Sequence, residues 1–210
     1  MLSLKDGTQV TTNVVPVSII SAASPGVAVE VDSDGDGVSD KMELLANTDP
    51  QNPADAPADG GVVTADKVSV ALKFSSPGSD SIKASYRLPT TESLTGAAIS
   101  VRLGEVSAVF AALSDKGRSG SGNATAKYKQ KTSMLQWTLK KQDLRERLGA
   151  NDLQNETTPQ AGKIVEVPIG VAIVKADGSK LAMDGSVSVL YKSQGRQDRQ
   201  GQAELNPIGK

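Results

Sequence analysis

Two alternating stretches, VSVALKF (68–74) and SIKASYRL (81–88), decide the fold class of this chain of 210 residues. In both, apolar and polar residues follow one another with a period of two, which places the apolar side chains on one face of a β-strand. The six residues between them, Ser-Ser-Pro-Gly-Ser-Asp, are typical of a turn. The sequence therefore predicts an antiparallel hairpin with one buried face.

The same pattern recurs through residues 62–193. AISVRL (98–103) and VSAVFAAL (106–113) meet across Gly104-Glu105, which predicts a second hairpin. Further strands are expected over 122–130, 133–139, 163–176 and 186–193, the third of them interrupted at Pro168. Short strands at regular spacing predict a mainly β fold, an antiparallel, immunoglobulin-like β-sandwich, with a closed barrel as the alternative.

One segment of the body departs from the period of two. In KKQDLRERL (140–148), Leu144 and Leu148 fall on one helical stripe with the preceding Leu139, and Gly149 suits a helix C-terminus. The sequence predicts one short helix here. Residues 194–210, which are rich in polar side chains, are expected to form a C-terminal tail.

The composition excludes several kinds of chemistry. The chain has no cysteine and no histidine, so it lacks disulfides, thiolate sites, the commonest general base and the commonest transition-metal ligand. A metal must be held by oxygen, which favours Ca²⁺ or Mg²⁺. We find no recognisable catalytic constellation and predict that the protein is not an enzyme.

The charge is nearly balanced, with 23 Lys and Arg against 24 Asp and Glu. A nearly neutral chain has no general attraction for nucleic acid, so nucleic-acid binding is not expected. No long apolar run is present, so membrane insertion is not expected either. A lysine-rich stretch lies around Tyr128 and Trp137 and is a candidate basic patch. Alternation places Lys127 and Lys129 on the solvent face and both aromatic residues in the core.

An acidic stretch, DSDGDGVSDKME (32–43), precedes the body within an Asp-, Pro- and Gly-rich module at residues 32–61. Its alternating aspartates, a glycine and a later glutamate are the pattern of a loop around a Ca²⁺ ion, which takes six to eight oxygen ligands. The predicted ligands are the side chains of Asp32, Asp34, Asp36, Asp40 and Glu43 and the carbonyl of Val38. Glu43 would lie on a short helix over Ser39–Asn47, and Gly37 permits the sharp turn. The strand-like PGVAVEV (25–31) before the loop argues against an EF-hand, which needs an entering helix.

The longer segment DSDGDGVSDKMELLANTDPQNPAD (32–55) resembles a bacterial thrombospondin type-3-like calcium repeat. The resemblance implies Ca²⁺ binding and a secreted, extracellular or cell-surface protein. It also implies Asn47, Asp49 and Asp55 as secondary ligands. The remaining chain resembles β-sandwich domains of secreted bacterial proteins, without a named family.

Residues 1–31 are predicted to be an apolar N-terminal β segment with strands at Thr8–Ile20 and Val27–Val31. Asp6, Thr-Thr-Asn and Pro16 make the segment a poor signal peptide. Such a strand either pairs with its own body or is donated to a neighbouring copy.

Together these features predict a secreted, non-enzymatic, calcium-binding structural or adhesive protein. In its sharper form, it is a self-assembling subunit of a surface fibre or matrix, whose partner is a second copy or a surface component. The alternative is a carbohydrate-binding or accessory module of a secreted enzyme, which would need an exposed aromatic platform.

Overall fold

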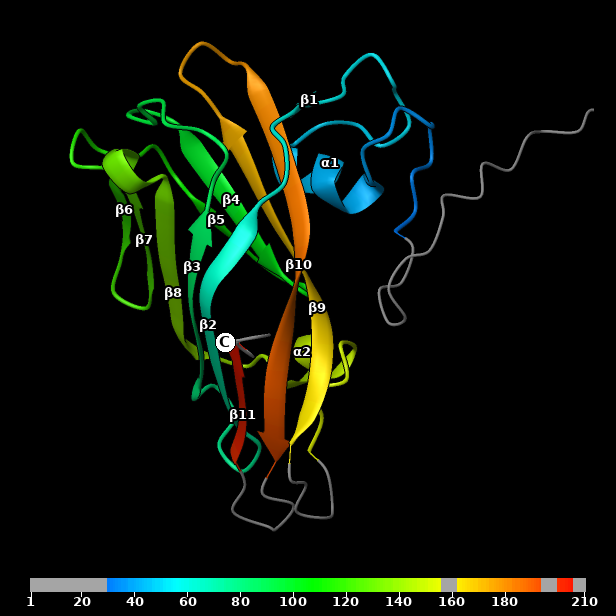
Figure 1. Ribbon diagram of the computed structural model, residues 1–210, viewed down its shortest axis with the longest axis vertical. Helices are drawn as coiled ribbons and strands as arrows, with labels where there is room; N and C mark the ends of the chain where they lie inside the picture. Colours follow the sequence, from blue (N-terminus) through cyan, green and yellow to red (C-terminus); the bar gives the residue numbers. More distant parts are fainter. Residues whose placement is uncertain (1–29, 156–161, 194–199, 206–210) are drawn as a thin grey trace, which may run out of the picture.

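The computed structural model describes residues 30–155, 162–193 and the backbone of 200–205 (Figure 1). Two short α-helices and eleven strands make up the described chain. They are α1 (Asp40–Ala46), β1 (Ala58–Asp59), β2 (Thr64–Lys73), β3 (Asp80–Arg87), β4 (Ala98–Leu103), β5 (Val106–Phe110), β6 (Arg118–Ser121), β7 (Ala124–Lys129), β8 (Met134–Gln142), α2 (Arg145–Gly149), β9 (Lys163–Val174), β10 (Lys180–Ser193) and β11 (Gln200–Leu205). The predicted strands at 8–20 and 27–31 lie wholly or almost wholly outside the described residues.

Both predicted hairpins are present as antiparallel pairs. β2 pairs with β3, with Val70 opposite Ile82, and β4 pairs with β5, with Val101 opposite Ala108. In β3 buried and less buried residues alternate along the whole strand, because its odd-even pattern places one set in the core.

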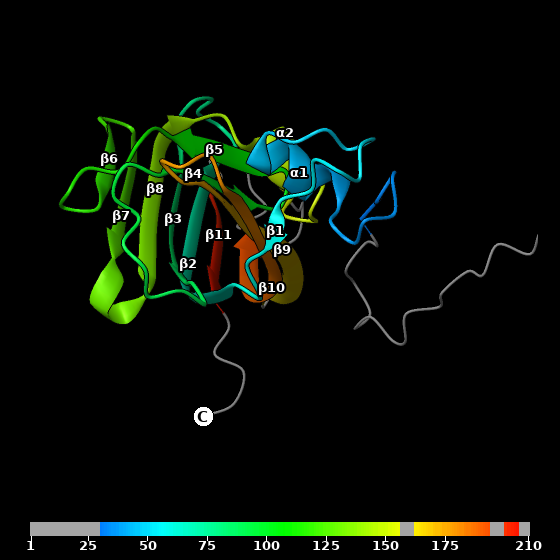
Figure 2. The ribbon, with the colours of Figure 1, turned by 90° about the horizontal axis from the view of Figure 1, so that it is seen from above.

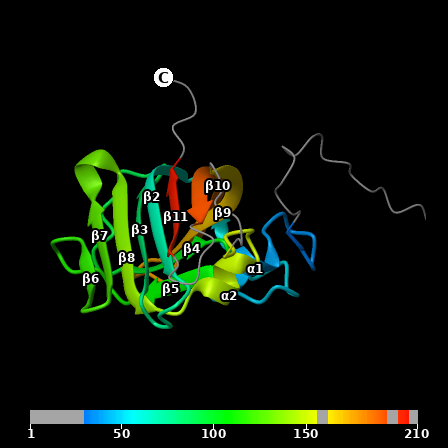
Figure 3. The same cartoon turned by 90° about the horizontal axis from the view of Figure 1, so that it is seen from below.

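The strands form one hydrogen-bonded path in the order β5-β4-β9-β10-β11-β2-β3-β8-β7-β6, and β1 adds to β10 in parallel. The path folds over, so that β4 and β5 lie against the layer that contains β2, β3 and β8 (Figure 2; Figure 3). Its two ends, β5 and β6, do not pair with each other. The mainly β, sandwich-like fold is therefore confirmed, and the described strands do not close into a barrel.

The core lies between these layers and unites residues from all of the longer strands. At its centre the rings of Tyr86 on β3 and Trp137 on β8 meet edge to face, with centroids 5.8 Å apart. The Tyr86 hydroxyl donates a 3.0 Å hydrogen bond to the carbonyl of Arg102 on β4, which joins the two layers. As predicted, Tyr128 and Trp137 are buried.

Several sequence-based expectations need correction. β9 is not interrupted at Pro168, because its pairing with β4 ends at Ile169 and the Pro168 carbonyl accepts a hydrogen bond from the Gly104 amide. The predicted helix at 140–148 starts later, at Arg145, because β8 continues to Gln142. Part of the expected C-terminal tail is a strand: β11 pairs on both sides, with β10 and β2.

None of the described helices is long and apolar enough to span a membrane.

Candidate calcium site

The acidic stretch folds into a loop that its own backbone amides hold in shape. Gly35 and Gly37 have φ angles of 77° and 96°, which a residue with a Cβ rarely adopts. Their amides donate to the two carboxylate oxygens of Asp32, at 2.8 and 3.0 Å. In the same way Asp34 accepts from the amide of Asp36 at 3.3 Å. The loop therefore curls around its aspartates.

This curl brings three carboxylates together. Each of Asp32, Asp34 and Asp36 places one carboxylate oxygen within 4.8 Å of the others. Like charges at this separation repel one another, and a bound cation would offset that repulsion. The three residues at alternate positions, which the sequence predicts as ligands, are thus close in space.

Glu43 is the most informative residue of the site. Its side chain comes from α1, its exposed fraction is 0%, and neither of its carboxylate oxygens has a hydrogen-bond partner among the described residues. One oxygen each of Asp34 and Asp36 is likewise buried without a partner. A buried ionised carboxylate is costly unless it is paired or binds a metal, so these four oxygens fit a cation with many oxygen ligands.

Electrostatics link Glu43 to the loop. Burial raises the pKa of the Glu43 carboxyl, and the charges of Asp34, Asp36, Asp40 and Asp32 raise it further. Burial also raises the pKa of the Asp34 carboxyl, and the charges of Asp36 and Asp32 raise this pKa further. The negative charges of the loop therefore act on Glu43, although Glu43 is not among the three residues whose carboxylate oxygens lie within 4.8 Å of one another.

Asp40 has a structural task in the loop. Its carboxylate accepts hydrogen bonds from the amide and the hydroxyl of Ser33, at 2.7 and 2.8 Å, and its own amide donates to the carbonyl of Val31 at 2.8 Å. These hydrogen bonds hold the end of the loop, at Asp40, against its beginning, at Val31 and Ser33. Its role as a ligand, like that of the Val38 carbonyl, stays a prediction.

The secondary ligand candidates lie beyond α1. Asn47 ends the helix with a left-handed φ of 57°, and its carbonyl accepts a 2.8 Å hydrogen bond from the amino group of Lys180 on β10. Asp55 accepts from the amide of Asp49 at 3.2 Å and from Lys180 at 3.4 Å. These contacts attach the end of the acidic segment to β10, and the structure does not bring the three residues into the Asp32–Asp36 cluster.

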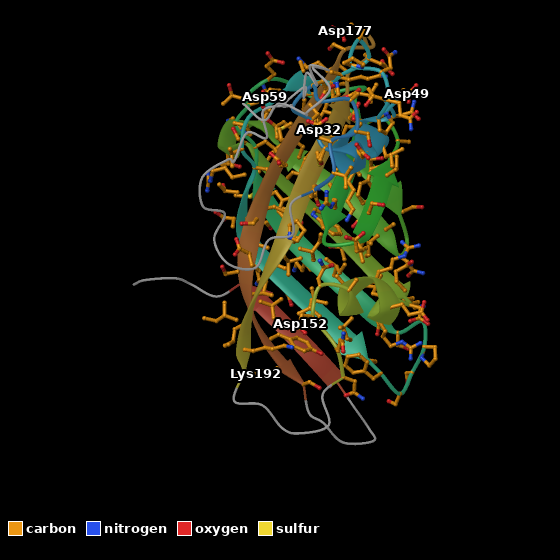
Figure 4. All side chains as sticks on the ribbon, turned by 90° about the vertical axis from the view of Figure 1, so that its right-hand side faces the viewer. Asp32, Asp49, Asp59, Asp152, Asp177 and Lys192 are labelled. Atoms are coloured by element: carbon orange, nitrogen blue, oxygen red, sulfur yellow. The ribbon has the colours of Figure 1, made fainter. Side chains whose placement is uncertain are left out.

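Helix α1 also fixes the loop to the sandwich. It packs against β4, β9 and β10, with Met42 and Ala46 buried. A Cβ on Gly170 of β9 would lie 2.6 Å from the sulfur of Met42, so a glycine there allows the close approach. Figure 4 shows Asp32 and Asp49 at the same end of the molecule as Asp177, which lies between β9 and β10.

Two ion pairs complete this attachment, and sequence reasoning missed both. Arg102 on β4 pairs with Glu30, and Lys41 on α1 pairs with Glu105 in the β4–β5 turn. Arg102 is the charged residue of a buried strand, AISVRL, and this is the one signal that could have indicated a buried partner.

Comparison with known families gives one match. Residues 32–53 match the model of the bacterial TSP3 repeat, the segment in which the sequence predicted such a repeat. TSP3 repeats are calcium-binding repeats and suggest an extracellular protein. Comparisons with curated proteins and with solved structures found no significant match.

Proposed function

We propose that the protein is a non-enzymatic structural or adhesive protein of the cell exterior in which a Ca²⁺ ion fastens the acidic module to the β-sandwich. The buried, unpartnered carboxylate of Glu43 is the observation that carries this proposal. Asp32, Asp34 and Asp36 would hold the ion together with Glu43, with the Val38 carbonyl and Asp40 as further ligands. Bound calcium would supply positive charge to an acidic cluster and join loop to helix.

The position of α1 determines how calcium binding would affect the stability of the β-sandwich. Glu43 is one residue from Met42, which packs on β9, so an ion that binds loop and helix also holds the loop against the sandwich. Binding to the folded state alone raises the free energy of unfolding by mass action. Calcium would therefore stabilise the whole protein rather than a flexible linker.

The experiment is a calcium titration of the full chain by isothermal calorimetry, with thermal unfolding in excess chelator and in excess Ca²⁺. We expect one site and a clear rise of Tm with Ca²⁺, and a much smaller effect of Mg²⁺, which prefers a tighter octahedral shell. No binding heat and an unchanged Tm would overturn the proposal.

A second candidate function, self-assembly by strand donation, is supported by the edge of the sheet. β5 ends the path, so its outer backbone groups have no partner strand among the described residues. Beside it runs a groove of about 240 Å³ between α1 and the β4–β5 hairpin. Leu44 and Val109 line this groove and are 67% and 74% exposed. An open edge beside a groove with exposed leucine and valine side chains suits an added strand.

The donor that we propose is the apolar segment within residues 1–29 of a second copy. The described chain begins at Glu30, which is paired with Arg102, another residue lining the groove. Glu30, the first described residue, therefore lies beside this groove, and a neighbouring copy presents the same edge.

Light scattering of the full chain with Ca²⁺ and then with chelator tests this assembly. Val109→Lys should prevent it, because a charge in the groove opposes burial of an apolar strand. Ile164→Lys, at a 64% exposed position on β9, is the matched control and should assemble like the wild type. A wild-type protein that stays monomeric at all concentrations would exclude strand donation.

The carbohydrate-binding alternative lacks the platform that it needs for neutral sugars. All six aromatic residues lie in the described chain: five are buried, and Phe74 is half-buried. A stacking surface on the sandwich is therefore missing. The absence of enzymatic activity stays a prediction.

A further inference from the structure

The outward face of the layer formed by β2, β3, β8, β7 and β6 is strongly cationic. On β2, β3, β7 and β8 the side chains alternate, so that apolar residues enter the core and polar residues point outward. β6 has no apolar face, and its Arg118 lies opposite the outward Lys127 of β7. Seven of the outward cations have no ion-pair partner among the described residues, and we call this set the basic face. Its members are Lys67, Lys73, Lys83, Arg118, Lys127, Lys129 and Lys140.

Carboxylates are nearly absent from the same strands. Only two occur in the five: Asp80 is buried in the core, and Asp66 is paired with Arg87 at 3.1 Å. The acidic residues concentrate instead in the acidic module at residues 32–61. Its helix α1 packs on β4, β9 and β10, and the module lies across the molecule from β6, β7 and β8 (Figure 1). A nearly neutral chain thus has one acidic and one basic region.

Strand register arranges the cations in rows with hydrogen-bonding side chains. One row runs Lys67, Ser85, Gln136, Lys127 and Arg118 across all five strands. Because neighbouring strands lie about 4.8 Å apart, such a row spans about 19 Å. Over the part of the row on β3, β8, β7 and β6 lies a depression of about 400 Å³ lined by Lys83, Arg118 and Lys127, together with Thr125, Gln136 and Thr138. The surface therefore offers charge and hydrogen bonds along a line, as an extended ligand requires.

We propose that the basic face binds an anionic polysaccharide, a chain that carries carboxylate or sulfate groups. The cations would pair with the acidic groups, and the hydroxyl and amide side chains would bind sugar hydroxyls. Single-stranded nucleic acid fits less well, because it stacks its bases on exposed aromatic side chains, and Tyr86, Tyr128 and Trp137 on these strands are buried. A neutral polysaccharide would leave the cations unused.

The test is calorimetric titration of the calcium-loaded full chain with hyaluronate, which carries carboxylates, dextran sulfate, which carries sulfates, and neutral dextran. We expect binding to one or both anionic polymers, weakening as salt rises, and no binding to dextran. The triple variant Lys83→Gln, Arg118→Gln, Lys127→Gln should lose about tenfold or more in affinity. All three side chains lie on the surface, so the variant should fold, which its Tm checks.

The matched control removes three cations outside the basic face: Arg147→Gln on α2, Lys175→Gln after β9 and Lys192→Gln on β10. This control has the same net charge as the first triple variant. It should bind the anionic polymers within about twofold of the wild-type affinity, if the position of the cations rather than total charge determines binding. Equal losses in both triple variants, binding to dextran, or tighter binding to a DNA oligonucleotide would each overturn the proposal. So would self-association at low salt that depends on the basic face and occurs without polymer, which would assign the face to the acidic module of a second copy.

Discussion

The guanidinium of Arg102 on β4 binds the carboxylate of Glu30, which lies two residues before the acidic loop that starts at Asp32. Nη1 donates to Oε2 at 2.8 Å, Nη2 donates to Oε1, and Nε donates to the Gly104 carbonyl at 2.9 Å. The hydroxyl of Ser39, just before α1, also donates to Glu30 at 3.0 Å. The pair therefore joins the sandwich, the start of the loop and the start of the helix.

Replacing Arg102 with methionine should lower the free energy of unfolding by about 2–4 kcal/mol, because a half-buried carboxylate then loses its partner. The double variant Arg102→Met, Glu30→Gln should recover part of that loss, since it leaves no unpaired charge. Urea unfolding of the two single variants and the double variant measures this coupling. Strictly additive effects would mean that the pair contributes no interaction energy.

Glu43→Gln should have opposite effects with and without calcium. In chelator we expect the variant to have a higher Tm than the wild type, because it removes a buried charge whose pKa is raised by burial and by four aspartates. In excess Ca²⁺ we expect it to have a lower Tm, because the buried ligand is lost. A variant with the same calcium-induced rise in Tm as the wild type would exclude Glu43 as a ligand.

Met42→Ala should separate α1 from the sandwich. Met42 is 2% exposed and contacts β9, so its truncation should cost about 2–4 kcal/mol in the free energy of unfolding and should weaken calcium affinity. Leu44→Ala, at a 67% exposed position two residues away on the same helix, should change stability by less than about 0.5 kcal/mol in the monomer. Equal effects of the two changes would contradict the packing described for α1.

Asp80→Ala should destabilise the far end of the sandwich. The buried Asp80 carboxylate accepts hydrogen bonds from the amides of Lys73 at 2.7 Å and Leu144 at 2.9 Å, and thereby joins the β2–β3 turn to α2. Leaving two amides unsatisfied should cost about 2 kcal/mol or more in the free energy of unfolding, measured in urea. Asp143→Ala, which removes an exposed partner of Arg145, is the control and should cost less than about 1 kcal/mol.

Local patterns predicted much of the fold. The period of two in 68–74 and 81–88 marks strands whose inner faces are buried, and the two-residue turn at Gly104-Glu105 predicts the β4–β5 hairpin. Strands without that alternation were missed. β6, RSGS, has no apolar face, and β11, QGQAEL, has little apolar character, so both depend on pairing with distant strands.

The candidate site likewise has a part that the sequence predicted and a part that it did not. The spacing of Asp32, Asp34 and Asp36 predicted their approach to one another, because a short loop determines it. What holds the module in place is not local: Glu30 meets Arg102, and Lys180 meets Asn47 and Asp55, over more than seventy residues of chain. Such contacts depend on tertiary packing, about which residue spacing says nothing.

The position of β11 between β10 and β2 has a consequence for biosynthesis. β2 is paired with residues that are made well over a hundred positions later, so during synthesis its edge stays open until residue 205 has emerged. Until then the nascent chain exposes two unpaired, apolar-backed edges, which is the state most prone to wrong pairing. The last described strand to be synthesised is thus the one that joins the strands on its two sides into one continuous sheet.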